Sequence, residues 1–312
     1  MPRPVVIVNP QAAAGGAGRR WPSIRQAVEE ALGPVEGLLT ERPDHATELT
    51  RRALQQGAEL VVAVGGDGAL NEVVNGFFLD DQPIRPEAAL GYVPLGTGGD
   101  FRRMLGAPRD PETAARQLDL TRACTVDVGK VRYTRREGGE AVRYFVNLAS
   151  FGLGGEVSRR AKQSVFASRS GRAAFLHATA MGLLAYPGKD VRLRLDDGVE
   201  REYSITNVAI GNGGYHGGGM RPCPRAQLDD GLLEVTVIEK LGLLDAATSL
   251  PILYGPDIYR HPKVHHFRAK KLSASSDSLT EIEIDGESLG VLPLEVAVLP
   301  GALRLLTPQK LK

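Results

Sequence analysis

The sequence predicts two domains of different class: an α/β domain with a parallel sheet, and an all-β-rich domain of sandwich or barrel type. Over residues 1–127, short Val-rich runs alternate with helical stretches, and each run ends in glycine or a polar turn. Beyond that point, short runs of alternating apolar and polar residues are separated by turn residues. The first pattern is typical of a parallel sheet covered by helices, and the second of an antiparallel sheet.

In the first domain, the expected elements alternate along the chain. Strands are expected at residues 4–10, at 35–40, before Gly65 and from residue 88, and helices at 21–32, at 44–57 and after Gly68. Asp44 is the expected cap of the second helix and Gly57 its end. Because the carboxyl ends of parallel strands meet at one edge of a sheet, we expect ligands there, near Asn9, Gly65 and Gly96.

In the second domain, eight short alternating runs indicate antiparallel strands. One helical stretch, roughly residues 159–186, interrupts them. No internal repeat or low-complexity tail is visible along the chain. The change of pattern near residues 125–130 therefore predicts the domain junction.

The composition indicates an ordinary globular protein. The 312 residues are 42% hydrophobic and 24% charged, and the net charge of +1 excludes a strongly basic nucleic-acid-binding protein. Two cysteines, Cys124 and Cys223, exclude a disulfide framework or a zinc-ligand cluster. The apolar run near the N-terminus is too short for a signal peptide, and no run approaches the ~18–20 apolar residues of a membrane span. A cytoplasmic protein is expected.

The stretch GGDGALNEVVNG, residues 65–76, follows an apolar strand and begins a helix. Glycines let the backbone approach a phosphate, and the helix N-terminus favours negative charge. The dinucleotide motif is excluded because Asn71 stands where it requires glycine, and no Gly-Lys pair completes a P-loop. Asp67 would repel a phosphate unless a cation lay between them. The stretch therefore predicts polyphosphate with Mg²⁺, and an ordinary glycine turn is the alternative.

Seven stretches resemble, in order, the motifs of the diacylglycerol kinase catalytic family, which includes bacterial lipid kinases and sphingosine kinases. They are VNPQAAAGG, LLTERPDHATEL, VVAVGGDGALNEVVNG, LGTGGDF, VDVGKV, GNGGYHGGGMRPCPRAQLDDGLLEV and EIDGE. The resemblance implies a nucleotide-binding domain over 1–127 and a β-rich, lipid-substrate domain over 128–294. It further implies that a segment at about 295–312 returns to the first domain.

The same resemblance implies an ATP-dependent lipid kinase that uses Mg²⁺. Diacylglycerol, phosphatidylglycerol and sphingoid bases are the acceptors in view. The residues that it assigns to the nucleotide follow the predicted strands, with the phosphates on the backbone from Gly66 to Glu72. They are Asn9, Pro10, Gln11, Ala12, Ala13, Thr40, Gly66, Asp67, Gly68, Ala69, Leu70, Asn71, Glu72 and Thr97.

Three aspartates form the predicted catalytic Mg²⁺ network: Asp67, Asp100 and Asp127. Each lies in or beside a glycine-containing turn at a predicted strand, and Mg²⁺ prefers hard oxygen ligands, directly or through water. Turn stabilisation by aspartate is the alternative interpretation. The chain departs from the family at Gly99, where the usual residue is asparagine, so an amide is lost while Asp100 is kept.

The IDGE motif provides the candidate base. Glu287 follows a predicted strand and a glycine turn, and the family match assigns it as the base that takes the proton from the acceptor hydroxyl. Asp285 would point to the same side if the strand geometry continued, and it would assist Glu287. An ordinary hairpin turn is the alternative interpretation of this motif.

The QLDDGLL stretch matches a loop that holds a structural Mg²⁺ in the family. Carried over to this chain, Gln227 and Leu232 contribute backbone carbonyls and Asp230 contributes its carboxylate. A tight turn without metal is the alternative.

Residues 159–194 are the predicted membrane contact. This segment is rich in arginine and lysine, and it includes a 14-residue apolar stretch, 173–186, which is too short to span a bilayer. Such a pattern suits peripheral attachment to an anionic lipid surface, although a core helix explains the apolar face equally well. A homodimer is a further expectation from the family, and no nucleic-acid partner is expected.

Two other functions stay open from sequence. An NAD kinase-like enzyme shares the GGDG motif and a β-rich second domain, whereas QLDDGLLEV and the terminal DGE favour a lipid kinase. A non-catalytic nucleotide-binding regulator would be expected to have lost some of the carboxylates that this chain retains.

Overall fold

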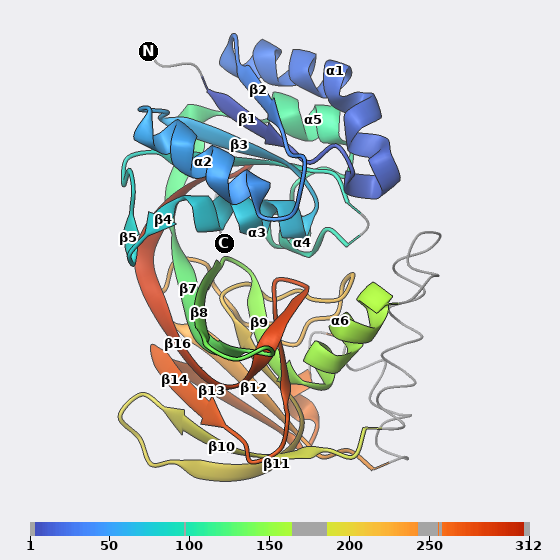
Figure 1. The fold of residues 1–312 in the computed structure, drawn as a ribbon, viewed down its shortest axis with the longest axis vertical. Helices are drawn as coiled ribbons and strands as arrows, with labels where there is room; N and C mark the ends of the chain where they lie inside the picture. The colour runs from blue at the N-terminus through green and yellow to red at the C-terminus, as the bar shows by residue number, and fades with distance from the viewer. Residues whose placement is uncertain (1–3, 97, 164–185, 243–254, 256–257, 309–312) are drawn as a thin grey trace. The chain divides into compact units, whose positions relative to one another are not determined.

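The protein forms two compact units, Met1–Asp127 with Gly301–Lys312, and Val128–Pro300. The computed structural model describes residues 4–96, 98–163, 186–242, 255 and 258–308 (Figure 1). Two long strands, β7 (Ala123–Arg135) and β16 (Glu287–Leu306), contribute residues to both units. The first unit therefore contains chain from both ends of the sequence.

The first unit is built on a parallel sheet with the strand order β2-β1-β3-β6-β16. Its strands are β1 (Val5–Val8), β2 (Glu36–Leu39), β3 (Leu60–Gly65), β6 (Ala89–Pro94) and the end of β16, which pairs Arg304 and Leu305 with Ala89 and Leu90. Because β2 and β3 lie on opposite sides of β1, the carboxyl ends of β1 and β3 flank a topological switch point. Open α/β sheets bind ligands at such points.

Helices cover both faces of this sheet. They are α1 (Ala12–Leu32), α2 (His45–Gln55), α3 (Asp67–Gly76), α4 (Asp100–Leu105) and α5 (Pro111–Arg116), followed by a 3₁₀ turn at Leu120–Arg122; β4 (Phe78–Leu79) and β5 (Gln82–Pro83) form a separate hairpin. Helix α1 packs with α5, and α2 packs with α3 (Figure 1). Val6 and Val8 share a core with Ile24 and Val28 of α1. Since successive strand residues point to opposite faces, the buried Ile7 lies on the other side.

Two helix starts differ from the prediction. The helix expected at 21–32 begins at Ala12, and its first turns contain residues with left-handed backbone angles. The stretch is rich in small residues, which show no apolar period. Asp44 also does not cap α2, because it is left-handed (φ 61°) and its side chain makes no capping hydrogen bond. The expected end at Gly57 agrees with the structure, where α2 ends at Gln55.

The second unit is an antiparallel β structure whose strand pairing closes on itself. Its elements are the rest of β7, β8 (Glu140–Phe145), β9 (Leu148–Gly152), α6 (Leu153–Gln163), β10 (Lys189–Leu195), β11 (Arg201–Gly211), β12 (Leu233–Glu239), a 3₁₀ turn at Ile258–Arg260, β13 (Val264–Ala269), β14 (Lys271–Ser275), β15 (Glu281–Ile284) and most of β16. Strand β11 pairs with β10 through its first half and with β9 through its second half. The path β9-β15-β16-β14-β10 then returns to β11, so the unit is barrel-like.

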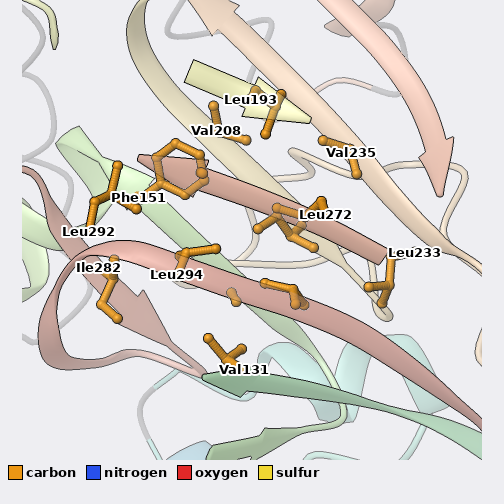
Figure 2. Packing of buried hydrophobic residues seen from close by; sticks show 14 of the residues in the cluster. Val131, Phe151, Leu193, Val208, Leu233, Val235, Leu272, Ile282, Leu292 and Leu294 are labelled. Carbon is orange, nitrogen blue, oxygen red and sulfur yellow. The ribbon is translucent and has the colours of Figure 1, made fainter. Parts of the chain in front are cut away.

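The core of the second unit lies inside this closed path. Figure 2 shows Phe151, Val208, Leu272 and Leu294, which come from four different strands, within one buried cluster. The alternating runs of the sequence supply these side chains, since every second residue of a strand points inward. The predicted α/β and β-rich classes are therefore both confirmed.

Candidate active site

The nucleotide-side residues predicted in the first unit collect at one edge of its sheet. Three backbone hydrogen bonds extend the strand pairing past the strand ends: Thr40 N to Val8 O (2.8 Å), Asn9 N to Val64 O (3.1 Å) and Leu95 N to Gly65 O (2.7 Å). These bonds bring the residues that follow β1, β2, β3 and β6 together at the carboxyl edge. Thr97, another predicted nucleotide contact, lies outside the described residues.

The loop after β1 has strained backbone. Asn9 Oδ1 accepts the N–H of Gln11 at 3.0 Å, and Pro10 O accepts the N–H of Gly18 at 3.1 Å. Between these contacts, Ala13 (φ 53°) and Ala14 (φ 54°) are left-handed without being glycine. Each such residue costs roughly 1–2 kcal/mol, and strain of this kind tends to occur at ligand sites. The strained residues overlap the end of the predicted nucleotide segment, Asn9–Ala13.

The GGDG turn forms the N-terminus of α3 without a side-chain cap. Gly66 is the N-cap residue, and its carbonyl accepts the N–H of Leu70 at 3.1 Å, which is the first bond of the helix. The N–H groups of Asp67, Gly68 and Ala69 therefore precede the helical hydrogen-bond ladder, as the first N–H groups of any helix do. Such groups and the helix dipole suit a phosphate.

The later residues of this predicted segment have structural surroundings. Leu70 and Asn71 are buried. The backbone and side-chain oxygens of Asn71 accept bonds from the Asn75 amide at 2.8 and 3.1 Å, and the Glu72 carboxylate bonds to the start of α2. These contacts are structural, and the role of Leu70, Asn71 and Glu72 toward the nucleotide stays a prediction.

Asp67 is the centre of the contacts between the GGDG and GTGGD turns. Its Oδ2 accepts the N–H of Asp100 at 3.1 Å and its Oδ1 accepts the N–H of Phe101 at 3.2 Å, so it caps α4. Burial raises the pKa of Asp67, and the nearby Asp100 carboxylate raises it further, while the backbone N–H bonds oppose the rise. A cation beside these two acids would remove the repulsion between them.

The surroundings of Gly98 fit such a cation. A Cβ built at Gly98 would lie 3.0 Å from Asp67 Oδ2 and 3.9 Å from Asp100 Oδ2, so both carboxylates border the space that glycine leaves. Carboxylate oxygens are the ligands that Mg²⁺ prefers, and each can accept more than one partner. The residues of these two turns therefore fit Mg²⁺ with a polyphosphate.

Asp127 has different surroundings from the other two predicted metal ligands. It is 2% exposed, and its Oδ1 accepts the N–H of Gly301 at 2.8 Å, which connects β7 with β16 inside the first unit. Within the described ranges, no three His, Cys, Asp or Glu side chains are grouped so as to hold a metal. The three-aspartate network stays a prediction, and the structure brings Asp67 and Asp100 together.

Gly99, where the chain departs from the family, has a left-handed backbone (φ 64°). Asparagine is the side chain that best tolerates this conformation, so the exchange conserves the shape of the turn. Arg103 Nη1 donates to the carbonyls of Gly98 (2.5 Å) and Gly99 (3.0 Å) and to Asp100 Oδ1 (3.0 Å). The sequence reasoning missed this arginine, although it lies three residues after a predicted metal ligand.

In the second unit, the predicted base follows a two-residue hairpin turn. Ile284 pairs with Glu287, and the turn between them is Asp285 (φ 47°) and Gly286 (φ 87°). Asp285 therefore leaves the strand, and the expected continuation of strand geometry was wrong because an Asp-Gly pair favours a tight turn. Its N–H donates to Leu148 O (2.8 Å) and its Oδ1 accepts the N–H of Leu148 (2.9 Å), while Glu287 is half-buried.

The predicted structural Mg²⁺ loop in the second unit already holds a cationic side chain. Asp230 Oδ1 accepts the N–H of Leu232 at 3.0 Å, and Asp230 Oδ2 pairs with the Arg268 guanidinium. Gln227 is exposed beside it. The charge of Asp230 is thus compensated by Arg268, and the bound Mg²⁺ at this loop stays a prediction.

The basic segment 159–194 is partly neutralised by acids from elsewhere in the chain. Arg159 lies 3.4 Å from Glu281, and Arg192 pairs with Asp277 at 2.7 Å. Counting charges along the segment could not reveal these partners, which come from β15 and the preceding turn. The apolar stretch 173–186 lies almost wholly outside the described residues, and no helix in the described part of the chain is long and apolar enough to cross a membrane.

Two family models together match most of the chain. The model described as "Diacylglycerol kinase catalytic domain" matches residues 3–131, and the model described as "YegS C-terminal NAD kinase beta sandwich-like domain" matches residues 147–307. A diacylglycerol kinase of Staphylococcus saprophyticus is 30% identical over 98% of this chain and 96% of its own length. A YegS-like lipid kinase of Chromohalobacter salexigens is 32% identical over 94% and 91%.

Solved structures show the same fold. A Bacillus anthracis protein provisionally called a diacylglycerol kinase superposes with a TM-score of 0.79 and 26% identity, covering 98% of this chain and 95% of that one. Yeast NADH kinase reaches a TM-score of 0.50 at 10% identity, covering 97% and 82%. The second likeness concerns the fold alone.

Proposed function

The chain belongs to the diacylglycerol kinase catalytic-domain family of lipid kinases, and from that premise we propose that it transfers the γ-phosphate of Mg²⁺–ATP to the hydroxyl of a membrane lipid. The observation that carries the proposal is the pairing of the GGDG and GTGGD turns through Asp67. Asp67 and Asp100 both lie beside Gly98, and Asp67 begins α3, which has no side-chain cap. This arrangement suits a polyphosphate that arrives with its metal.

The residues of the first unit would bind and orient the donor. The backbone N–H groups from Asp67 to Ala69 would bind phosphate oxygens, and the loop from Asn9 to Ala13 would frame the nucleotide. Asp67 and Asp100 would hold Mg²⁺, with Asp127 as the third predicted ligand. When bound there, the metal supplies neutralisation of the charge on the transferring phosphoryl group.

Glu287 would act on the acceptor in the second unit. As the lipid hydroxyl oxygen bonds to the γ-phosphorus, the bond from that phosphorus to the bridging oxygen breaks, and ADP leaves with the electron pair. The hydroxyl proton passes to the Glu287 carboxylate. Asp285 holds the turn before it through Leu148, which supports a positioning role for this side chain.

Diacylglycerol is the first acceptor to test, because relatives that match along almost the whole chain are named diacylglycerol kinase. Phosphatidylglycerol and sphingoid bases are the other acceptors in view. These are membrane lipids, so the enzyme would work at a membrane surface, with segment 159–194 as the contact. A homodimer is part of the same proposal.

The test is transfer of labelled phosphate from ATP to micellar lipids and to NAD, with and without Mg²⁺. We expect a labelled lipid from the wild type and a kcat lower by roughly 10²–10⁴-fold in Glu287→Ala. Glu295→Ala, which removes an exposed carboxylate from the same strand, is the matched control and should match the wild type. Labelled NAD would replace the lipid kinase by an NAD kinase, and ATP binding without any labelled product would favour a regulator.

A further inference from the structure

A buried carboxylate lies beneath the turn that carries the predicted base. Glu283 of β15 is 0% exposed, and both of its oxygens have partners. Oε1 accepts the N–H of Gly286 at 2.8 Å, and Oε2 accepts the Ser150 hydroxyl at 3.2 Å. A buried carboxylate is costly unless such partners compensate it, so this arrangement is held by specific contacts.

The bond to Gly286 fixes the peptide between Asp285 and Gly286, inside the turn that precedes Glu287. Both residues of the turn are held by hydrogen bonds: Asp285 exchanges two with Leu148, and the Gly286 N–H donates one to Glu283. Glu287 is the next residue, and its backbone also pairs with Ile284. The direction in which the Glu287 carboxylate leaves the strand therefore depends on Glu283.

The same carboxylate reaches the glycine loop at 213–220. His216 Nε2 lies 3.2 Å from Glu283 Oε2, which is close enough for an ion pair when the imidazole is protonated, and the His216 side chain is only 11% exposed. The loop closes by two backbone bonds between His216 and Met220 (2.9 and 2.8 Å), and the three glycines between them all have positive φ. Those glycines have no side chains with which to hold the loop tip. The His216 side chain holds it instead, through its contact with Glu283.

The start of α6 lies close to the Glu283 carboxylate. A Cβ at Gly154 would lie 2.6 Å from Ser150 Oγ and 3.5 Å from Glu283 Oε2, so a larger residue would displace the network. The Gly154 N–H donates to Asn207 Oδ1 at 2.9 Å, which fixes the helix start on β11. Glu283 thus joins strands β15 and β9, the turn before Glu287 and the glycine loop.

We propose that Glu283 and His216 are positioning residues for phosphoryl transfer. Glu283 fixes the turn that presents Glu287 to the acceptor hydroxyl, and His216 couples that turn to the 213–220 loop, so that loop and base move as one body. The inference rests on the proposed lipid kinase function. It assigns no proton transfer to either residue, because both act through Glu287 and the loop.

The test compares Glu283→Ala and Glu283→Gln in the full-length protein, with labelled ATP and diacylglycerol micelles. The alanine variant should lower kcat by roughly 10–100-fold with an unchanged KM for ATP, because displacing a catalytic group by about 1 Å can cost 10²-fold. The glutamine variant keeps an oxygen for Gly286 and an amide for the other partners, and should restore kcat to within about threefold of the wild type.

Glu234 is the matched control. It is a second buried carboxylate of the same unit (2% exposed) that lies 3.1 Å from a histidine, His266, and it belongs to β12 rather than to the turn. Glu234→Ala should alter the thermal midpoint while kcat stays within about twofold. If Glu283→Ala loses no more kcat than Glu234→Ala, the positioning role is overturned.

His216→Ala provides a second route if Glu283→Ala does not fold. It should lower kcat/KM for the lipid about tenfold and leave the KM for ATP unchanged, and His216→Gln, which can place an amide near Glu283, should recover most of the loss. Unchanged lipid kinetics in His216→Ala would overturn the coupling. A wild type that labels no lipid at all would instead overturn the proposed function and this inference with it, so the two failures are distinguishable.

Discussion

The side chain of Glu72 caps a helix that begins 27 residues earlier in the chain: its Oε2 accepts the backbone N–H of Ala46 at 3.1 Å. The Glu72 carbonyl also accepts the Thr47 hydroxyl at 2.8 Å. The helix that follows the GGDG turn is thereby fastened to the start of α2. Glu72 does for α2 what the sequence assigned to Asp44.

Replacing Glu72 with alanine should destabilise the protein by about 1 kcal/mol, the usual cost of a lost helix cap. Asp44→Asn should change the stability by less than about 0.5 kcal/mol, because Asp44 makes no capping bond and asparagine tolerates its left-handed backbone. Urea unfolding of both variants beside the wild type measures the difference. Equal losses in the two variants would contradict this assignment of the cap.

Gly98→Ala should impair Mg²⁺–ATP binding with little loss of fold. The added methyl would fill the space 3.0 Å from Asp67 Oδ2 that the two carboxylates border. We expect the affinity for ATP in the presence of Mg²⁺ to fall at least about tenfold, because the methyl group occupies the space in which Asp67 and Asp100 would hold the cation. Calorimetric titration of ATP with and without Mg²⁺ tests this. An unchanged affinity would mean that the cation is held elsewhere.

Asp285→Asn should keep most of the activity, whereas Asp285→Ala should not. Asparagine retains an oxygen for the Leu148 N–H and tolerates φ 47°, while alanine loses the bond and is strained in this conformation. We expect kcat within about fivefold of the wild type for asparagine and a loss approaching 10²-fold for alanine. If asparagine were as inactive as alanine, the negative charge of Asp285 would matter for the chemistry itself.

Stability should fall as the pH rises from about 4.5 to about 7 because of Glu234. Burial raises the pKa of this carboxyl from 4.5 to about 7, with a hydrogen bond from Tyr259 partly opposing the rise. The folded protein then binds a proton that the unfolded chain has released, so the free energy of unfolding declines across this window and levels off above it.

Glu234→Gln should remove that decline. The comparison uses the free energy of unfolding of the variant minus that of the wild type. This difference should be up to about 3 kcal/mol more favourable to the variant at pH 7.5 than at pH 4.5, since one pKa unit corresponds to 1.36 kcal/mol. Thermal midpoints of both proteins across pH 4.5–8 test the sign. If the variant became less stable relative to the wild type as the pH rises, Glu234 would be shown to be stabilised as a carboxylate.

The sequence was informative where a residue's role depends on its neighbours in the chain. The Val-rich strand before Gly65 and the Asp-Gly pair at 285–286 both act locally, and the fold class and hairpin follow from them. The sequence failed where partners are remote. Glu72 caps α2, Arg268 pairs with Asp230, and Glu281 pairs with both Arg136 and Arg159, across long separations that no local pattern encodes.

Glu283 is a residue whose buried position the sequence pattern does not reveal. It alternates with Glu281 in the strand EIEI, and both acids are buried, on a strand whose other residues are isoleucine. Two acids at every second position of a short apolar strand usually mark its solvent face. Here both acids are buried and have polar partners instead. Periodicity alone cannot distinguish this case from a strand with a solvent-exposed face.

The pairing of β16 with β6 has a consequence for synthesis on the ribosome. Arg304 and Leu305 complete the parallel sheet of the first unit, whose other strands come from the first hundred residues. While the intervening barrel is being translated, the outer edge of β6 lacks its partner and its backbone groups are open to wrong pairing. The unit that is translated first therefore completes its sheet last.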